Sequence, residues 1–468
     1  MNLDKIAEFI DAVAGHMYWP WTVCLMLAMA AFFTIRTGFV QFRRLGEAFR
    51  TMAATQQAGA GGAISPFQAF MTGLAATIGT GNIVGVATAI VSGGPGALFW
   101  IWCYGVLAAA LKFSEAVLGM RYRIAHGEQT LSGPMYYLRD GLGSPALAWI
   151  YALIAAIAVL FTTPFTQPNS IAGVLNAQLR ASQLHLGSWT LGGNNGRTVD
   201  LNLLVIGIVL AVLTWLVIIG GVKSIGRAAE KLSPLKVGFY LLGGLIVIGV
   251  NIARLPEVLS LVFHDAFSLR PVAGAAAGTV MGHAMRYGLA RGMYANEAGY
   301  GTAAVVYGVA KSNRPDQQGL NAVMEVLIIT FVTSTISALT ILLSGSYAIK
   351  DIEGPAAVSE AFSSAMPHVG GWIVAFSVFL FGYTTLLGWS FYGEQYLEYL
   401  FGSWIVKPYR WFYCLLIPLG AIAKVKVVWA WGDILNGAQI FPNLIGLVAL
   451  SGIAAMYARR RRDDEGKD

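Results

Sequence analysis

Residues 73–85 read Gly-Leu-Ala-Ala-Thr-Ile-Gly-Thr-Gly-Asn-Ile-Val-Gly and lie inside a long apolar segment, 66–91. Glycine destabilises a helix interior by about 1 kcal/mol relative to alanine, and three glycines fall within seven positions here. In hydrocarbon, unwound backbone is tolerated only where it faces protein or a watery cavity. The stretch therefore predicts a helix broken at 79–81. One half-helix end would present carbonyls to a hard cation, and the other would present N–H groups to a carboxylate.

The alternative is that these glycines only let two helices approach closely, as small residues do between membrane helices. Thr80 and Asn82 among the glycines favour the break. A dinucleotide-binding fingerprint is excluded, because the third glycine falls one place late and no strand precedes the run.

Composition places this break in a membrane. The 468 residues are 56% hydrophobic and only 12% charged, whereas soluble domains carry about a quarter charged residues. The net charge of +7 comes from basic residues dispersed among loops, which argues against a nucleic-acid-binding face. Three single cysteines in apolar stretches show neither metal-site nor disulfide spacing and are interpreted as small buried hydrophobic residues.

The sequence predicts an all-α polytopic membrane protein with about 11 transmembrane helices, since such a helix needs about 20 largely apolar residues. The segments are 18–35, 66–91, 97–120, 146–179, 201–221, 235–252, 272–310, 319–346, 371–400, 409–423 and 436–458. Loops are expected at 183–200 and 350–368, and an amphipathic helix at the outer interface over 255–269. The first segment is expected to be a retained helix, because no basic region precedes it.

Orientation follows from the loops, since cytoplasmic loops carry an excess of Lys and Arg. With the basic cluster 459–462 in the cytoplasm, eleven helices put the N-terminus outside. Most of the other basic residues then fall inside, Lys236 among them. The expected location is a bacterial or archaeal plasma membrane.

Segment 272–310 repeats the glycine-rich theme, with Gly274, Gly278 and Gly282 followed by charged residues. Glycine-interrupted spans at matching positions of two halves indicate a transporter site between inverted repeats. Segment 272–310 is five segments after 66–91, which fits a 5+5 inverted-repeat core with two broken helices plus one extra N-terminal helix. The predicted divisions are 1–65 (extra helix and loop), 66–252 (first repeat), 253–271 (interfacial), 272–458 (second repeat) and 459–468 (tail).

Further polar residues at membrane depth are functional candidates. Gln167 has an amide that needs several partners away from water. Thr384 and Thr385 either bond back to their own helix or face the site. Glu325 is a candidate by default, because intramembrane carboxylates are costly.

The chain resembles the alanine or glycine:cation symporter family, of the amino acid–polyamine–organocation superfamily. Five motifs carry the resemblance in order from about residue 36 to 400, and these are 76–90 (ATIGTGNIVGVATAI), 93–102 (GGPGALFWIW), 133–137 (GPMYY), 291–299 (RGMYANEAG) and 388–394 (GWSFYGE). Around Ile329-Thr330 the family often has Asp-Thr, and the acid is absent here.

The resemblance implies a fold shared with the neurotransmitter:sodium symporters, and it implies two kinds of site residue. Substrate contacts would come from the N–H groups of Thr80 and Gly81, next to Gly79, and from Gln167, Gly278, Met281, Gly282 and Trp389. One Na⁺ would be bound by the carbonyls of Ala75 and Ile78 with the hydroxyls of Thr384 and Thr385, and a second cation by Thr77 and Asn82.

The expected function is Na⁺-coupled symport of small neutral amino acids such as alanine and glycine by alternating access. Na⁺ is co-transported, and no cofactor, nucleic acid or obligate protein partner is expected. The first alternative is an H⁺-coupled carrier that uses Glu325 or Glu297. A membrane-embedded enzyme is disfavoured, because the sequence has no paired histidine spacing, Walker A or nucleophile-elbow motif. A channel is disfavoured by the two broken helices.

Overall fold

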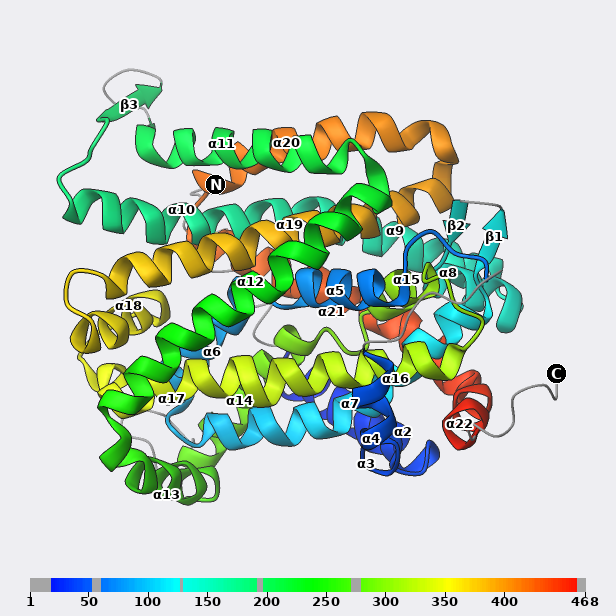
Figure 1. Cartoon of the computed structure of the whole chain (residues 1–468), viewed down its shortest axis with the longest axis horizontal. Coiled ribbons are helices and arrows are strands. Elements are labelled where there is room, and N and C mark those ends of the chain that lie inside the picture. The colour runs from blue at the N-terminus through cyan, green and yellow to red at the C-terminus, as the bar shows by residue number, and fades with distance from the viewer. Residues whose placement is uncertain (1–17, 53–59, 127–128, 192–196, 271–278, 461–468) are drawn as a thin grey trace.

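The chain is described by a computed structural model over residues 18–52, 60–126, 129–191, 197–270 and 279–460. Figure 1 shows most helices aligned with the longest axis of the molecule, with α5 near the centre and α12 crossing the view obliquely. Apart from two small antiparallel hairpins, β1–β2 and β3–β4, the described elements are helical.

The elements of the first half surround the predicted break. They are η1 (Tyr18–Thr22), α2 (Val23–Arg36), α3 (Val40–Arg43), α4 (Leu45–Thr51), α5 (Pro66–Thr77), η2 (Thr80–Asn82), α6 (Val84–Gly93), α7 (Ala97–Arg121), β1 (Ile124–His126), β2 (Gln129–Leu131), α8 (Pro134–Tyr136), η3 (Tyr137–Gly141), α9 (Pro145–Phe161), α10 (Thr163–Ala181), β3 (Ser188–Leu191), β4 (Arg197–Asp200), α11 (Leu201–Ile218), α12 (Gly221–Val250) and η5 (Ile252–Arg254).

The second half begins with the helix expected at the interface. Its elements are α13 (Leu255–Ala266), α14 (Val280–Asn296), α15 (Thr302–Gly308), α16 (Pro315–Leu327), η6 (Ile328–Ser334), α17 (Thr335–Ser344), η7 (Ser346–Ala348), α18 (Gly354–Ala365), α19 (Gly370–Phe401), η8 (Ser403–Ile405), α20 (Val406–Ala421), α21 (Val425–Ala449) and α22 (Ser451–Arg459).

The polytopic membrane fold is confirmed. Within the described residues, 7 helices are long and apolar enough to cross a membrane, or 9 if each of two bent pairs is one span. The two remaining predicted spans are also helical but fall short by this criterion. α14 has 17 residues and α20 has 16, so both are shorter than the 18 residues required.

The helix break predicted from the glycines is present, and the local sequence explains where α5 starts. Ser65 and Gln68 form a reciprocal capping box, and Pro66 occupies the first turn, where its missing N–H has no intrahelical partner to lose. The helix ends at Thr77, and the chain continues into η2 and α6 at an angle of 65° to it.

Three boundaries differ from the sequence prediction. The expected loop 350–368 contains α18, and the segment predicted as 436–458 starts at Val425 and bends by 62° between Ala449 and Ser451. α12 starts at Gly221 rather than at 235, so Lys236, expected at the cytoplasmic end of segment 235–252, lies in the middle of a helix and is fully buried. The polar residues of the early turns, Lys223 to Lys231, hid this start, because they lower the apolar content of the segment.

Close helix packing depends on glycines that have no conformational role. A Cβ at Gly119 of α7 would come within 2.3 Å of the Ala304 carbonyl oxygen of α15, and one at Gly288 within 2.5 Å of the Ala97 carbonyl oxygen. Small residues let membrane helices approach until their backbones touch. These contacts hold α7 against both halves of the second broken helix.

We expect Gly119→Ala to lower the free energy of unfolding by about 1–3 kcal/mol, because the backbone of α15 has to move away from the added methyl group. Thermal unfolding of the purified protein in detergent measures the change. Gly238→Ala on α12 is the matched control, since a Cβ there meets no atom within 4 Å. Equal unfolding temperatures for the two variants would contradict this account of the packing.

Candidate functional site

The first helix break is an extended turn closed by its own polar groups. Gly79 has φ −108° and ψ −165°, and its N–H donates to the Thr77 carbonyl at 3.0 Å. The Asn82 side-chain amide donates to the same carbonyl at 2.9 Å. Asn82 therefore fixes the shape of the turn from its far side.

A buried lysine holds the carbonyl end of this break. Lys236 Nζ donates to the carbonyl oxygens of Leu74, Ala75 and Ile78 at 3.1, 3.2 and 2.6 Å, and to Thr384 Oγ1 at 2.7 Å. Leu74 and Ala75 lie in the last turn of α5 and Ile78 is its C-cap residue, so these carbonyls are at the negative end of the helix dipole. The Leu74 carbonyl also accepts the Ile78 N–H at 3.0 Å. The ammonium thus joins α12, α5 and α19.

A neutral amide holds the N–H end of the break. Gln167 Oε1 accepts a hydrogen bond from the Thr80 N–H at 3.1 Å and another from Thr80 Oγ1 at 3.0 Å. Gln167 comes from α10, whose Pro164 lies in the first turn and Pro168 inside the helix. The predicted anion-binding N–H group therefore already has an oxygen acceptor, but an uncharged one.

The second helix break lies between α14 and α15. Glu297 is left-handed, with φ 52°, and Gly299 and Gly301 have φ 94° and 87°, a backbone region that favours glycine. Glu115 Oε1 accepts hydrogen bonds from the N–H groups of Gly299 and Gly301 at 2.8 and 3.1 Å. Asn443 Nδ2 adds a third hydrogen bond at 3.0 Å, so this carboxylate is fixed in place.

A second buried lysine holds the carbonyl end of this break and links the two breaks. Lys112 Nζ donates to the Asn296 carbonyl at 2.7 Å and forms an ion pair with Glu325 Oε1 at 2.7 Å. Glu325 also accepts hydrogen bonds from Thr77 Oγ1 at 2.6 Å and the Tyr307 hydroxyl at 2.7 Å. Glu325 therefore lies between α5 and α15.

A small cavity lies between the breaks. Its volume, measured as the space open to the centre of a water-sized sphere, is about 20 Å³, which is room for about one water molecule. Its lining residues come from both breaks and from α10, α19 and α21, and are Ala76, Thr77, Gly79, Gly81, Asn82, Thr162, Thr163, Gln167, Tyr294, Ala295, Glu297, Tyr300, Thr385, Trp389 and Asn436. All except Tyr294 are buried, so the cavity is nearly closed.

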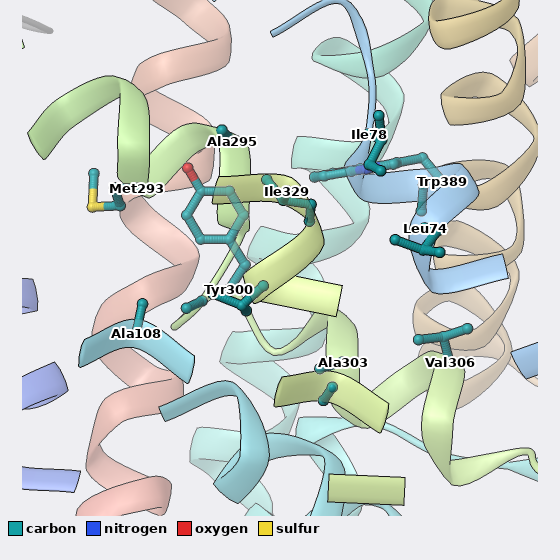
Figure 2. Packing of buried hydrophobic residues seen from close by; sticks show 14 of the residues in the cluster. Leu74, Ile78, Ala108, Met293, Ala295, Tyr300, Ala303, Val306, Ile329 and Trp389 are labelled. Carbon is teal, nitrogen blue, oxygen red and sulfur yellow. The ribbon is translucent and has the colours of Figure 1, made fainter. Parts of the chain in front are cut away.

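Aromatic and carboxylate groups shape the cavity wall. Trp389 Nε1 donates to Glu297 Oε1 at 2.9 Å, and Thr302 Oγ1 donates to Glu297 Oε2 at 2.9 Å. Figure 2 shows Trp389 on the same side of the view as Ile78, with Tyr300 nearer its centre. Among the described residues that line the cavity, Glu297 is the one acidic residue and none is basic.

Polar contacts close the protein on both sides of the cavity. Before the second break, Arg291 and Asp433 lie 3.8 Å apart, and the Tyr294 ring covers Gly81. Beyond it, the Arg123 guanidinium donates to the carbonyls of Gly61, Gly308, Ala310 and Ser312 at 2.6–3.1 Å. Arg123 thereby ties the segment before α5 to the segment after α15.

The structure brings together most of the residues singled out in the sequence. Gly79, Gly81, Gln167, Trp389, Thr77, Asn82 and Thr385 line the cavity, and Thr80 is bonded to Gln167. Ala75, Ile78 and Thr384 surround the Lys236 ammonium, and Thr385 Oγ1 donates to the Ala75 carbonyl at 3.1 Å.

Two predicted residues lie away from the cavity. Met281 and Gly282 are in the first turn of α14, where Thr279 caps the helix. Both residues precede Tyr294, a lining residue of the cavity on the same helix, by at least twelve positions. Twelve residues of α-helix correspond to about 18 Å along the helix axis, so Met281 and Gly282 lie well away from the cavity. Gly278 falls outside the described residues.

Sequence reasoning missed several lining residues and the two lysines. The missed lining residues are Ala76, Thr162, Thr163, Tyr294, Ala295, Tyr300 and Asn436. Tyr294 and Ala295 fall in a quoted motif, 291–299, which was the available signal. Thr162 and Thr163 carry no such signal, because single polar residues near helix ends are common, and Asn436 is a single polar residue in the middle of α21 that no motif marks.

The two interrupted helices, the closed polar cavity between them and the apolar spans around them define a membrane transporter. The chain belongs to the sodium:alanine symporter family, whose family model matches residues 3–467. It is a family of transporters.

Curated relatives match over nearly the whole chain. The chain is 37% identical over 456 residues to the sodium/alanine symporter AgcS of Methanococcus maripaludis, with 95% of each protein covered. It is 33% identical over 473 residues to the probable sodium/glutamine symporter GlnT of Bacillus subtilis, covering 100% of this chain and 93% of that protein.

Solved structures show the same fold at low identity. MhsT in complex with L-phenylalanine matches with a TM-score of 0.54 at 14% identity, over 87% of this chain and 99% of that one. The manganese transporter of Eremococcus coleocola matches with a TM-score of 0.54 at 14% identity, over 86% and 81%. The transporter fold with broken helices is therefore confirmed.

We expect Lys112→Met to lower the free energy of unfolding by about 3–5 kcal/mol, because it leaves the Glu325 carboxylate buried without its cation. Lys112→Met with Glu325→Gln is expected to recover much of this loss, as measured by thermal unfolding in detergent. Lys350→Met, at an exposed lysine, is the control. A double variant no more stable than the single one would contradict the pairing.

Proposed function

We propose that this protein is a Na⁺-coupled symporter of small neutral amino acids, alanine and glycine, that works by alternating access. The main support is the hydrogen bond between Gln167 Oε1 and the Thr80 N–H at the edge of the cavity. A neutral oxygen at a helix N-terminus is displaced by a carboxylate more readily than a charged one is, because the dipole favours the anion.

The substrate in this proposal binds across the cavity. Its carboxylate takes the N–H groups of Thr80 and Gly81, beside Gly79, and displaces the amide oxygen of Gln167. Its ammonium group faces Glu297, which is the acidic residue of the lining. Trp389 limits the space for the side chain, so short side chains are selected by exclusion.

The transported Na⁺ in this proposal binds near the same end of the break. Asn82 Oδ1 is buried and accepts no hydrogen bond from the residues that the structure describes. Such an oxygen is a suitable ligand for a hard cation. Together with Thr77 it lies next to the carboxylate position, so the ion and the substrate would attract each other, and each would strengthen binding of the other by the same factor.

Alternating access requires that the two closures open in turn. The Arg291–Asp433 contact closes one side, and the Arg123 hydrogen bonds close the other. We propose that the Arg123 side faces the cytoplasm and the N-terminus lies outside. The basic loops support this orientation in a bacterial or archaeal plasma membrane. Alkaline phosphatase and green fluorescent protein fused after residue 468 would report it.

Proton coupling is the second candidate, because Glu297 and Glu325 are buried carboxylates at the two breaks. One relative, 32% identical over 483 residues, is named a putative sodium/proton-dependent alanine carrier. Uptake driven by a pH gradient in Na⁺-free buffer would favour this candidate. The hydrogen bonds that already satisfy Glu325 favour Na⁺.

We expect purified protein in liposomes to accumulate radiolabelled alanine with an inward Na⁺ gradient and not with a matched K⁺ gradient. Gly81→Leu should abolish accumulation, because a Cβ at Gly81 already comes within 2.8 Å of the Tyr294 ring. Gly173→Leu, at an exposed glycine on α10 with open space around it, should keep accumulation. Na⁺-independent uptake of alanine would contradict the coupling.

We expect competition with labelled alanine to fall steeply with side-chain size. Unlabelled glycine and alanine should compete fully, whereas leucine and phenylalanine should compete at least about 100-fold more weakly, since overpacking a closed site costs about 1–3 kcal/mol or more. Inhibition constants for the four amino acids provide the measurement. Equal constants for alanine and phenylalanine would overturn the proposed size selection.

A further inference from the structure

The environment of Lys236 resembles that of a bound metal cation more than that of a paired lysine. Its side chain is fully buried, and its ammonium is surrounded by three carbonyl oxygens and one hydroxyl oxygen at 2.6–3.2 Å. Among the described residues no carboxylate lies within ion-pair distance of it. Lys112, in contrast, has the carboxylate of Glu325 at 2.7 Å.

The same oxygens were assigned to Na⁺ by the family resemblance. Three of the four ligand positions expected there, Ala75 O, Ile78 O and Thr384 Oγ1, are the acceptors of Lys236. A carbonyl and hydroxyl cage suits a hard monovalent cation, and an ammonium group supplies the same charge. A Na⁺ ion bound to these oxygens would lie against the ammonium, so the two cations exclude each other.

We propose that Lys236 is a covalently attached cation that permanently takes this Na⁺ position. The Na⁺ that drives transport then binds elsewhere, at Asn82 and Thr77. This inference rests on the proposed function, and it makes Lys236 a positioning residue. Its charge does for α5 and α19 what a bound ion would do, which is to hold the end of the interrupted helix in the shape that binds substrate.

The proposal predicts that removing the side chain creates a Na⁺ site. Lys236→Ala leaves four inward-facing oxygens and a space the size of the lost side chain. In liposomes, the ratio of labelled Na⁺ to labelled alanine taken up should be higher by about one in Lys236→Ala than in the unaltered protein, because reciprocal coupling applies to each ion bound. Lys231→Ala, at an exposed lysine of the same helix, should leave the ratio unchanged.

A binding measurement keeps the test decisive if the variant does not transport. The unfolding temperature of purified Lys236→Ala, without amino acid, should rise with Na⁺ but not with equal K⁺, and by more than that of Lys231→Ala, since a ligand bound only to the folded state stabilises it. An unchanged flux ratio in a transporting variant, or no additional Na⁺-specific stabilisation, would overturn the proposal.

The proposed function and the proposed role of Lys236 can be contradicted independently of each other. If the unaltered protein shows no Na⁺-dependent uptake, the proposed function is wrong. The Na⁺-specific stabilisation of Lys236→Ala still decides whether Lys236 occupies a cation position.

Discussion

The structure depends on satisfying the backbone groups that an interrupted helix exposes inside a membrane. Each break frees carbonyls at the end of one half-helix and N–H groups at the start of the next, with no water to replace the lost partners. Side chains satisfy these freed backbone groups in the same way at both breaks. A buried lysine holds the carbonyl end, Lys236 at the first break and Lys112 at the second, and a side-chain oxygen holds the N–H end. A lysine thus complements the negative end of the helix dipole at both breaks, whereas an acidic side chain lies at the N–H end of the second break and a neutral amide at that of the first.

The difference between the two breaks supports the proposed substrate site at the first break. At the second break the N–H groups bind the carboxylate of Glu115, which three hydrogen bonds fix in place. An incoming anion there would have to displace a charge of its own sign. At the first break the N–H of Thr80 binds only the neutral amide of Gln167, beside the cavity. The N–H end of the first break is therefore available for the carboxylate of the proposed substrate. The N–H end of the second break has a structural role, because Glu115 already occupies it.

Sequence reasoning predicted the first break and most of its neighbours, because Gly79 and Gly81 flank polar residues that have no use in a continuous helix. It did not locate the second break, since glycines such as Gly288 serve helix packing and look the same in the sequence. Lys236 was expected at the cytoplasmic end of segment 235–252, because the polar early turns of α12 hid the start of that helix. Which oxygens a long side chain reaches depends on how α12 crosses α5, and local pattern contains no such information.

The contacts around Arg123 explain how motion at one end can reach the cavity. The Ala63 N–H donates to the Val309 carbonyl, and the Lys311 N–H donates to the Ile64 carbonyl, both at 2.8 Å. The start of α5 and the end of α15 are thus joined by backbone hydrogen bonds, and Arg123 holds the pair from the end of α7. Because both are halves of broken helices, they can move together when Arg123 releases them, without unfolding a continuous span. In the proposed alternating-access cycle, the breaks that line the cavity would therefore also act as hinges.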